Sequence, residues 1–337
     1  MPRSDAAPSL QVDYVPVEGS GTAALADALA QTGTLAVLGF GTDAAASTDP
    51  RYLRVPLQPH GAATLEVWRS RGPVRSGFDD GIRWCEDGTL QFGAIEVDEL
   101  QFDDGDNGIE AASAVAYARL NAFVRNRGYP HQLRIWNHLD AITAGGGDNE
   151  RYRRFCLGRA GGLGQFDTAA LPAASAIGRH DGVRTLQVYW LAARAPGAPL
   201  ENPRQVSAYR YPRQYGPQSP SFARAMLPPS PQMPLLLSGT ASVVGHESRH
   251  HDCIESQLAE TFANFDSLIA AARELRPALP AHFGPGSRLK VYVRDAEQLP
   301  RIAAALDAHL GPAVPRILLH AAICRRELQV EIDGVHA

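Results

Sequence analysis

The same order of strands and helices occurs twice in the chain, on either side of a long proline-rich segment. Hydrophobic periodicity in the first half predicts a strand, a helix, a strand and a helix, at 90–97, 109–127, 131–139 and 149–157. The second half repeats this series and adds two strands, at 235–244, 254–275, 289–294, 296–310 and within 316–337. We interpret the repeat as an internal duplication. The alternative is that two unrelated α+β units share this order by chance.

The pattern predicts an α+β protein in which helices pack on one face of mixed sheets. The helix at 254–275 is the clearest case, because its apolar residues form one stripe of Leu258, Phe262, Phe265, Leu268 and Ile269. Further strands are expected at 10–15, 35–39, 65–69, 82–85 and 185–192. We expect two domains, at 1–170 and 171–337.

Composition narrows the class of partner. The 337 residues, of which 45% are hydrophobic and 20% charged, suffice for a soluble protein with a large core. A formal net charge of −4 does not favour nucleic acid or an anionic membrane, so a small molecule is the expected partner. We find neither a secretory signal nor the roughly 20 apolar residues of a membrane span, and we expect a cytoplasmic protein.

The proline-rich segment at 195–234 lacks regular periodicity and is longer than most loops. It is rich in tyrosine and arginine, as Tyr209, Arg210, Tyr211, Arg213, Tyr215 and Arg224 show. Disordered segments are poor in aromatic residues, and long ordered loops commonly carry function. We therefore expect this loop to line a binding site.

One short motif suggests zinc. The sequence from His246 to His250 fits HExxH, in which a helix places two imidazoles on one face. Here the motif directly follows a predicted strand, and the helix begins only after Asp252, so we interpret the motif as a polar loop. A zinc hydrolase with Glu274 as a third ligand is the alternative. We expect no metal and no organic cofactor.

Other common sources of chemistry have no support in the sequence. The four cysteines are far apart and form no CxxC pair, which predicts free thiols at Cys85, Cys156, Cys253 and Cys324. The glycine-rich stretches at 38–41 and 158–164 lack a nucleotide-binding signature. A GxSxG nucleophile motif is also missing.

The C-terminal segment 316–337 combines an acid with a cation. Its last strand alternates, with polar residues at Glu327, Gln329, Glu331 and Asp333 and apolar residues at Leu328, Val330 and Ile332. If the segment is a hairpin that turns at 325–326, Glu331 pairs near His320 and lies on one face with Arg316, Ala322 and Cys324. Such a face would form an anion site. The alternative is that the polar side is solvated.

The same segment carries a resemblance to known families. The second half resembles the YjgF/RidA fold through Ser238-Gly239, the strand LKVYVRD at 289–295 and Pro315-Arg316 before Glu331. The whole chain resembles the chorismatases through RIWNHL (134–139), NERYRRFCLGRA (149–160), AYRYPRQYGPQSPSFARA (208–225), SGTASVVGHESRHHD (238–252) and the C-terminal segment. This resemblance implies two RidA-like domains, with the catalytic one at 171–337, and cleavage of chorismate to pyruvate and a ring product.

The resemblance also implies roles and products. It maps the family's general acid to Glu331, and the cysteine of members that form 3-hydroxybenzoate to Cys324. It is closest to the bifunctional branch of xanthomonadin biosynthesis, which also forms 4-hydroxybenzoate, a ubiquinone precursor. The alternatives are a chorismate hydrolase that yields a dihydroxycyclohexadiene carboxylate, and a RidA-like protein that binds small carboxylates or hydrolyses imines. RidA-like folds favour homotrimers, although two fused domains can mimic part of one.

The chemistry of chorismate predicts the remaining residues. Its two carboxylates require two cations, and arginine matches carboxylate geometry. Arg316 is expected as the first clamp and Arg224 as the second. Hydroxyl donors are expected from Tyr209, Tyr211 and Tyr215, and weaker candidates for the clamp are Arg153, Arg159 and Arg210. Glu331 would act only if burial keeps it protonated near neutral pH.

Overall fold

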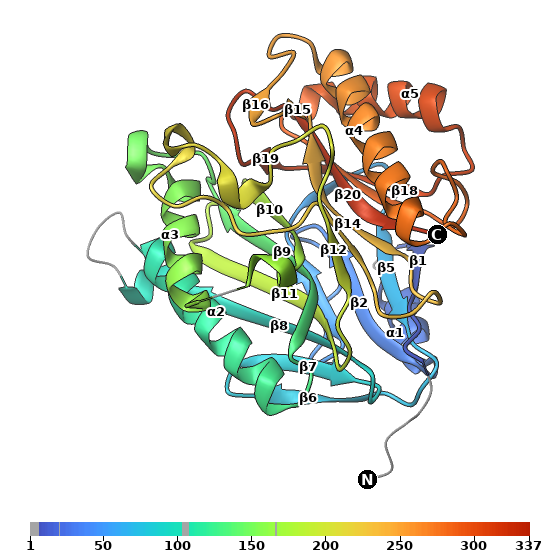
Figure 1. Ribbon diagram of the computed structural model, residues 1–337. Coiled ribbons are helices and arrows are strands. Elements are labelled where there is room, and N and C mark those ends of the chain that lie inside the picture. Colours follow the sequence, from blue (N-terminus) through green and yellow to red (C-terminus); the bar gives the residue numbers. More distant parts are fainter. Residues whose placement is uncertain (1–6, 20, 103–107, 166) are drawn as a thin grey trace.

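Two seven-stranded sheets of equivalent topology form most of the molecule, which is a computed structural model that describes residues 7–19, 21–102, 108–165 and 167–337 (Figure 1). The first sheet has the spatial order β19 (Ala322–Ile323), β10 (Ala173–Arg179), β9 (His131–Asp140), β11 (Thr185–Ala193), β8 (Leu90–Asp98), β7 (Ile82–Glu86) and β6 (Arg75–Asp79). The second has the order β4 (Gln58–His60), β18 (Arg316–His320), β17 (Arg288–Val293), β20 (Val330–His336), β14 (Leu235–Ala241), β13 (Ala225–Leu227) and β12 (Ala198–Leu200).

The two orders confirm the predicted duplication. In the first sheet β10 runs parallel to β9, and β11 lies antiparallel between β9 and β8. In the second, β18 runs parallel to β17, and β20 lies antiparallel between β17 and β14. The helices that connect these strands also correspond, with α2 (Gly108–Asn126) and α3 (Arg151–Leu163) in the first unit and α4 (Ile254–Leu275) and α5 (Leu299–Leu310) in the second.

Along the chain, the strands pass from the first large sheet to the second later than the expected domain boundary at 170/171. Strands β10 and β11 lie after residue 170 but belong to the first sheet. Apart from β4, which joins the second sheet early, and β19, which returns to the first, the second sheet is built from β12 onward. A division at 170/171 would therefore separate two strands from their sheet. The change falls between Ala193 and Ala198, while the assignment of two folding domains stays a prediction.

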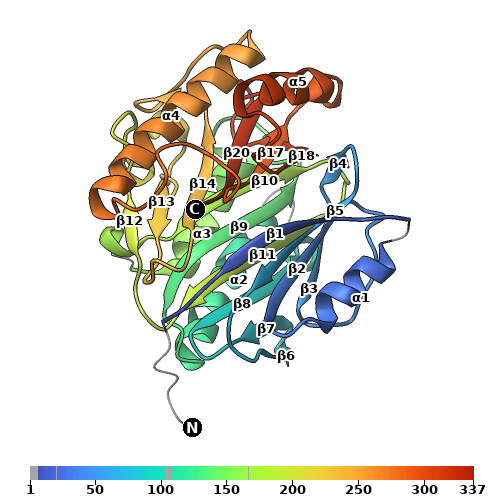
Figure 2. The same cartoon turned by 90° about the vertical axis from the view of Figure 1, so that its right-hand side faces the viewer.

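Helices cover the outer face of each large sheet, which confirms the α+β arrangement. Apolar residues of α2 and α3 pack with the outer face of the first sheet, and those of α4 and α5 pack with the outer face of the second. A four-stranded sheet of β1 (Gln11–Pro16), β5 (Thr64–Arg69), β2 (Thr34–Phe40) and β3 (Tyr52–Val55) packs against the inner faces of both (Figure 2). Helix α1 (Thr22–Ala30) covers the other face of this small sheet.

The predicted C-terminal hairpin is wrong. Strands β18 and β20 do not pair with each other, because both pair with β17, from opposite sides. Between them the chain leaves the second sheet, and β19 pairs with β10 of the first sheet. Glu331 therefore lies opposite Tyr292 of β17 and not near His320. The segment 321–329 crosses from one large sheet to the other, which brings Cys324 to the seam between them.

The proline-rich segment contains only short elements, which are β12, β13 and the single turns at Ala208–Arg210 and Arg213–Tyr215. The HExxH residues lie in and next to a small hairpin of β15 (Val243–Val244) and β16 (Glu247–Ser248), as the loop interpretation predicted. Within the described part of the chain, we find no helix long and apolar enough to cross a membrane.

Candidate active site

A cavity of about 550 Å³ lies at the seam between the two large sheets. Its walls come from β9 and β10 of the first sheet, β14 and β20 of the second, helix α3 and the proline-rich segment. Among the described residues that line it, the charged ones are Arg153, Arg159, Arg224, Arg325, Arg326, Glu150, Glu327 and Glu331. The excess of arginine suits a small anionic ligand.

Glu331 reaches this cavity because β20 alternates as predicted. Val330 and Ile332 point into the core under α4 and α5, so Glu331 and Asp333 point the other way, toward the first sheet. The polar side is not solvated, since Glu331 is only 5% exposed. Burial, and then the charge of Asp333, raise the pKa of Glu331 to about 8, although Arg134, Arg224 and Arg294 oppose this. The carboxyl group is therefore a protonated acid at neutral pH.

Gly239 of β14 leaves the space that the Glu331 side chain fills. A Cβ atom at this position would lie 2.0 Å from Oε1 of Glu331 and 3.2 Å from Oγ of Ser175. Any side chain here must displace the acid or push the two sheets apart. The Ser-Gly pair that carries the RidA resemblance thus has a direct steric function beside the carboxyl group.

We expect Gly239→Ala to lower turnover about tenfold or more, because a displacement of about 1 Å at a reacting group is costly. The measurement is steady-state turnover of the anionic substrate proposed below, with circular dichroism to check the fold. Gly284→Ala is the matched control, since a Cβ there meets nothing within 4 Å. Full activity of Gly239→Ala would show that the Glu331 carboxyl group can occupy another position.

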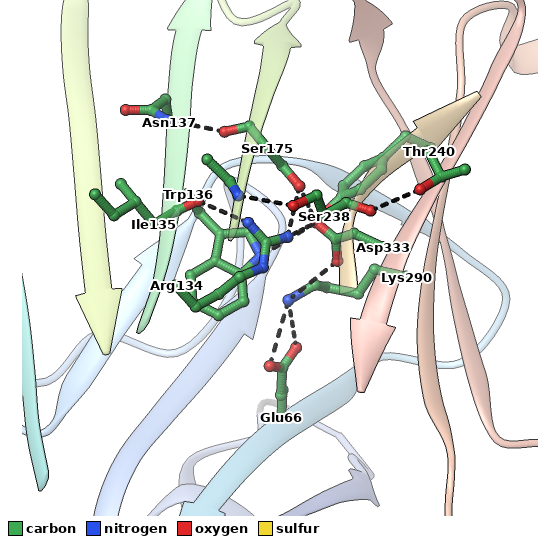
Figure 3. A network of polar contacts seen from close by, with 12 residues as sticks. Glu66, Arg134, Ile135, Trp136, Asn137, Ser175, Ser238, Thr240, Lys290 and Asp333 are labelled. Atoms are coloured by element: carbon green, nitrogen blue, oxygen red, sulfur yellow. Dashed lines mark hydrogen bonds and ion pairs between the residues drawn. The ribbon is translucent and has the colours of Figure 1, made fainter. Parts of the chain in front are cut away.

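Next to Glu331 along β20, a cluster of buried charges joins the two large sheets and the four-stranded sheet (Figure 3). Asp333 Oδ2 accepts hydrogen bonds from Arg134 Nη2 (3.0 Å), Ser175 Oγ (2.6 Å), Trp136 Nε1 (3.1 Å) and Tyr292 Oη (3.0 Å). Lys290 Nζ lies 3.8 Å from Asp333 Oδ1 and 3.0 Å from Glu66 Oε2. None of these residues was predicted as a site residue, and only Asp333 was predicted on the correct side of its strand.

The structure brings Arg224 and Tyr211 together in the cavity wall. Arg224 is 5% exposed, and its Nη2 donates to Tyr211 Oη at 2.7 Å and to the Val206 carbonyl at 2.9 Å. Its Nε is buried and has no hydrogen-bond partner among the described residues. This guanidinium keeps donors free for a ligand, as expected of a carboxylate clamp.

Tyr215 lies beside Tyr211, with ring centroids 5.4 Å apart, and its hydroxyl is 3.3 Å from His246 Nδ1. The Arg325 guanidinium stacks on the Tyr215 ring at 4.0 Å, and its Nη1 donates to the His246 carbonyl at 2.8 Å. These contacts tie the proline-rich segment to the turn that follows β19. The first histidine of the HExxH motif therefore serves as a contact of the cavity wall.

Arg159 of α3, a weaker candidate for the clamp in the sequence, lies in the cavity wall. Its side chain is 4% exposed and lines the cavity, and its guanidinium lies 4.9 Å from the centroid of the Tyr117 ring. Its Nε and Nη2 are buried without hydrogen-bond partners, and no ion pair is found for it among the described residues. A buried, uncompensated guanidinium is costly unless a ligand pairs with it.

Two of the expected binding residues lie elsewhere. Arg316 begins β18, and its guanidinium pairs with Asp307 of α5 and donates to the carbonyls of Gly311 and Val314. It does not line the cavity, because β17 separates its strand from β20. Tyr209 is also missing from the described lining, and Arg210 packs on its ring.

Cys324 lies in the cavity wall beside Cys156 and Glu331. Burial, together with the Glu331 carboxyl group, raises the pKa of this thiol far above its ordinary range. The sulfur is thus a neutral thiol at neutral pH. It can contact a ligand or donate a weak hydrogen bond, but it is not a thiolate.

A protonated carboxylic acid in an arginine-lined cavity is suited to acid catalysis on a small anion. The family described as "chorismatase FkbO/Hyg5-like, N-terminal" matches residues 66–192. A chorismatase of Streptomyces hygroscopicus is 36% identical over 282 residues, which make up 82% of this chain and 80% of that protein. A 3-hydroxybenzoate synthase of the same organism is 33% identical over 290 residues, 83% of each chain. The chain belongs to the chorismatase family.

Solved structures agree with this assignment. The crystal structure of a chorismatase matches 99% of this chain and 100% of its own, with a TM-score of 0.83 and 31% identity. RidA-type structures match only parts of the chain; the RidA of an Antarctic Psychrobacter covers 34% of it, with a TM-score of 0.28.

Proposed function

We propose that this protein cleaves chorismate to pyruvate and 3-hydroxybenzoate, with Glu331 as the general acid. The observation that carries the proposal is the buried carboxyl group of Glu331, whose pKa of about 8 leaves it protonated in a cavity lined by arginines. Membership of the chorismatase family supports the substrate, and the relative named 3-hydroxybenzoate synthase supports the product.

Arg159 and Arg224 are the proposed clamps for the two carboxylates of the substrate. Both guanidinium groups are buried, both line the cavity, and both keep N–H groups without protein partners among the described residues. Arg159 replaces Arg316 in this role. Tyr211, whose hydroxyl contacts Arg224, and Tyr215, beside it, complete the proposed binding residues.

The proposed reaction begins when Glu331 donates its proton to the terminal methylene carbon of the enol ether. This creates an oxocarbenium ion and leaves Glu331 as a carboxylate. The neighbouring ring hydroxyl attacks the ring carbon that carries the ether, and the carbon–oxygen bond to the pyruvyl group breaks. Pyruvate leaves, the hydroxyl proton returns to Glu331, and the resulting arene oxide isomerises to 3-hydroxybenzoate.

Incubation of the purified protein with chorismate tests the proposal. We expect pyruvate and an aromatic hydroxybenzoate in equal amounts, separated by chromatography. A dihydroxycyclohexadiene carboxylate in place of the aromatic product would identify a hydrolase. The absence of pyruvate would reject chorismate cleavage and favour a protein that only binds small carboxylates.

Cys324 is proposed to steer the intermediate toward 3-hydroxybenzoate. Because the thiol is neutral and lies in the wall with Glu331, it would act by contact with the ring and not as a base. We expect Cys324→Ala to change the ratio of products, including any 4-hydroxybenzoate formed by direct elimination, while pyruvate release continues. Cys253→Ala, at an exposed thiol, is the control. An unchanged product ratio would assign the Cys324 thiol to packing.

The bifunctional product pattern, a homotrimeric assembly and a cytoplasmic location stay predictions. The product pattern is read from the same chromatogram. Light scattering of the purified protein would measure the assembly.

A further inference from the structure

The buried charged residues next to Glu331 can affect the ionisation of its carboxyl group. We propose that the cluster of Glu66, Lys290, Asp333 and Arg134 positions Glu331 and sets the pH at which it ionises. Asp333 and Arg134 are the two positioning residues, of which Asp333 favours the protonated acid and Arg134 the carboxylate. The inference rests on the proposed role of Glu331 as a general acid. It adds a function for four residues that do not line the cavity.

The four side chains are fully enclosed and paired. None of the four residues is more than 3% exposed, and they come from β5 of the small sheet, β9 of the first sheet and β17 and β20 of the second. Two acids and two bases give a net charge of zero when all are ionised. Ionisation of Glu331 would add one negative charge that the cluster does not compensate.

The geometry connects the cluster to the acid through the backbone of β20. Asp333 lies two residues from Glu331 on the same side of the strand. Hydrogen bonds from Arg134, Ser175, Trp136 and Tyr292 hold its Oδ2 atom in place. Ser175 lies near the Glu331 carboxyl group as well, since Oγ of Ser175 and Oε1 of Glu331 both border Gly239. Ser175, which donates a hydrogen bond to Asp333, thus also lies next to the space that the Glu331 carboxyl group occupies.

Two members of the cluster have opposite electrostatic effects on Glu331. Asp333 raises the pKa of Glu331 and Arg134 lowers it. The other titratable groups that face Glu331 are Arg224 before β13, Arg294 after β17, Tyr152 on α3 and Cys324 after β19. Arg224 belongs to the proposed substrate site, so Asp333 and Arg134 are the pair whose charges can be changed without removing a ligand contact.

The test uses two single variants and their combination. Asp333→Asn leaves the cluster with one excess positive charge, and Arg134→Met leaves it with one excess negative charge. The double variant is neutral again and retains the Lys290–Glu66 pair. The basic limb of kcat/KM for chorismate reports the pKa of the free enzyme's acid. We expect this limb to move to lower pH by about one unit or more in Asp333→Asn, and to higher pH in Arg134→Met.

In the double variant the limb should return toward its wild-type position. A structural role alone predicts the reverse, because two substitutions disturb the cluster more than one. Single variants that fold but leave the limb in place, or that move it in the same direction, would overturn the inference. So would a double variant whose limb stays displaced.

A second measurement keeps the inference separate from the proposed function. Carbon-13 NMR of protein labelled at the glutamate carboxyl carbon follows the titration of Glu331, which is assigned by comparison with Glu331→Gln. The same opposite shifts and the same return are expected without substrate. If the wild-type protein does not cleave chorismate, the proposed function fails while the NMR titration still decides the effect of the cluster. Shifts that are absent or equal in sign would reject it.

Discussion

Glu331→Gln is expected to lower pyruvate release about 10³-fold while the protein stays folded, because general acid catalysis contributes about 10² to 10⁴ in rate. The amide has nearly the same shape as the protonated acid, so the cavity and its arginines should be preserved. A coupled pyruvate assay measures the rate. The control is Glu297→Gln, at an exposed position of the second unit, which should behave like the wild-type protein. A Glu331→Gln enzyme with near wild-type turnover would refute the general-acid role.

The same group predicts the pH dependence of the wild-type enzyme. The pKa of Glu331 is raised from 4.5 to about 8, so the acid is protonated below that value and ionised above it. We expect kcat/KM to fall tenfold per pH unit above about pH 8. The free energy of unfolding should also fall as the pH rises toward 8. Between about pH 4.5 and 8 the folded protein binds one proton more than the unfolded chain, so the free energy of unfolding falls as pH rises through this window.

The second large effect is expected at the two proposed clamps. Arg159→Met and Arg224→Met should each raise KM for chorismate about 10- to 100-fold, since a hydrogen bond to a charged group contributes about 1.5–3 kcal/mol. Turnover at saturation should change less, because a carboxylate clamp holds substrate and transition state alike. Arg210→Met, at an exposed arginine of the same proline-rich segment, is the control.

The two clamps should differ in their effect on stability. Two buried nitrogen atoms of Arg159 have no hydrogen-bond partner among the described residues, so its removal should leave the thermal midpoint unchanged or raise it. Arg224 holds the Val206 carbonyl and the Tyr211 hydroxyl, so its removal should lower the midpoint. An unchanged KM in Arg159→Met would mean that the ligand does not reach α3. In that case the second cation must come from another arginine of the wall.

Most helices and strands were predicted correctly, because the hydrophobic periodicity that indicates each of them lies within a single segment of the chain. The helix at 254–275 has the bounds of α4, since its apolar stripe continues without interruption over its whole length. The repeat of element order predicted a duplication that the sheets confirm. Strand β10 was not predicted, because its small residues, AASAIGR, give little alternation.

The site was harder to predict because it depends on pairing between distant strands. The alternation of β20 correctly placed Glu331 and Asp333 together, but the hairpin failed because β19 joins the other sheet. Arg316 was consequently placed beside an acid from which a whole strand separates it. Arg159 gave little signal, since an arginine on a helix is most often solvated. Lys290 gave no signal in the sequence, because its burial depends on ion pairs with Glu66 and Asp333, which lie far from it in the chain.

Because the two large sheets are repeats of one topology, the first sheet has a position equivalent to that of Glu331 in the second. When the segment RIWNHL is aligned with KVYVRD, Arg134 corresponds to Lys290 and Trp136 to Tyr292. The strand registers then extend the correspondence. Tyr292 lies opposite Glu331 and Lys290 opposite Asp333, whereas Trp136 lies opposite Tyr189 and Arg134 opposite Leu191. The first unit thus has a phenol and an aliphatic side chain where the second has its two acids.

The two repeats therefore contribute different residues to one site. The second copy carries the proposed proton donor, and the first contributes Arg159 of α3 and, from β9, Arg134 of the charge cluster. Neither copy has a complete site without the other, although each has its own sheet and helices. A titration calorimeter should accordingly count one bound dicarboxylate per chain, and not two, despite the repeated architecture.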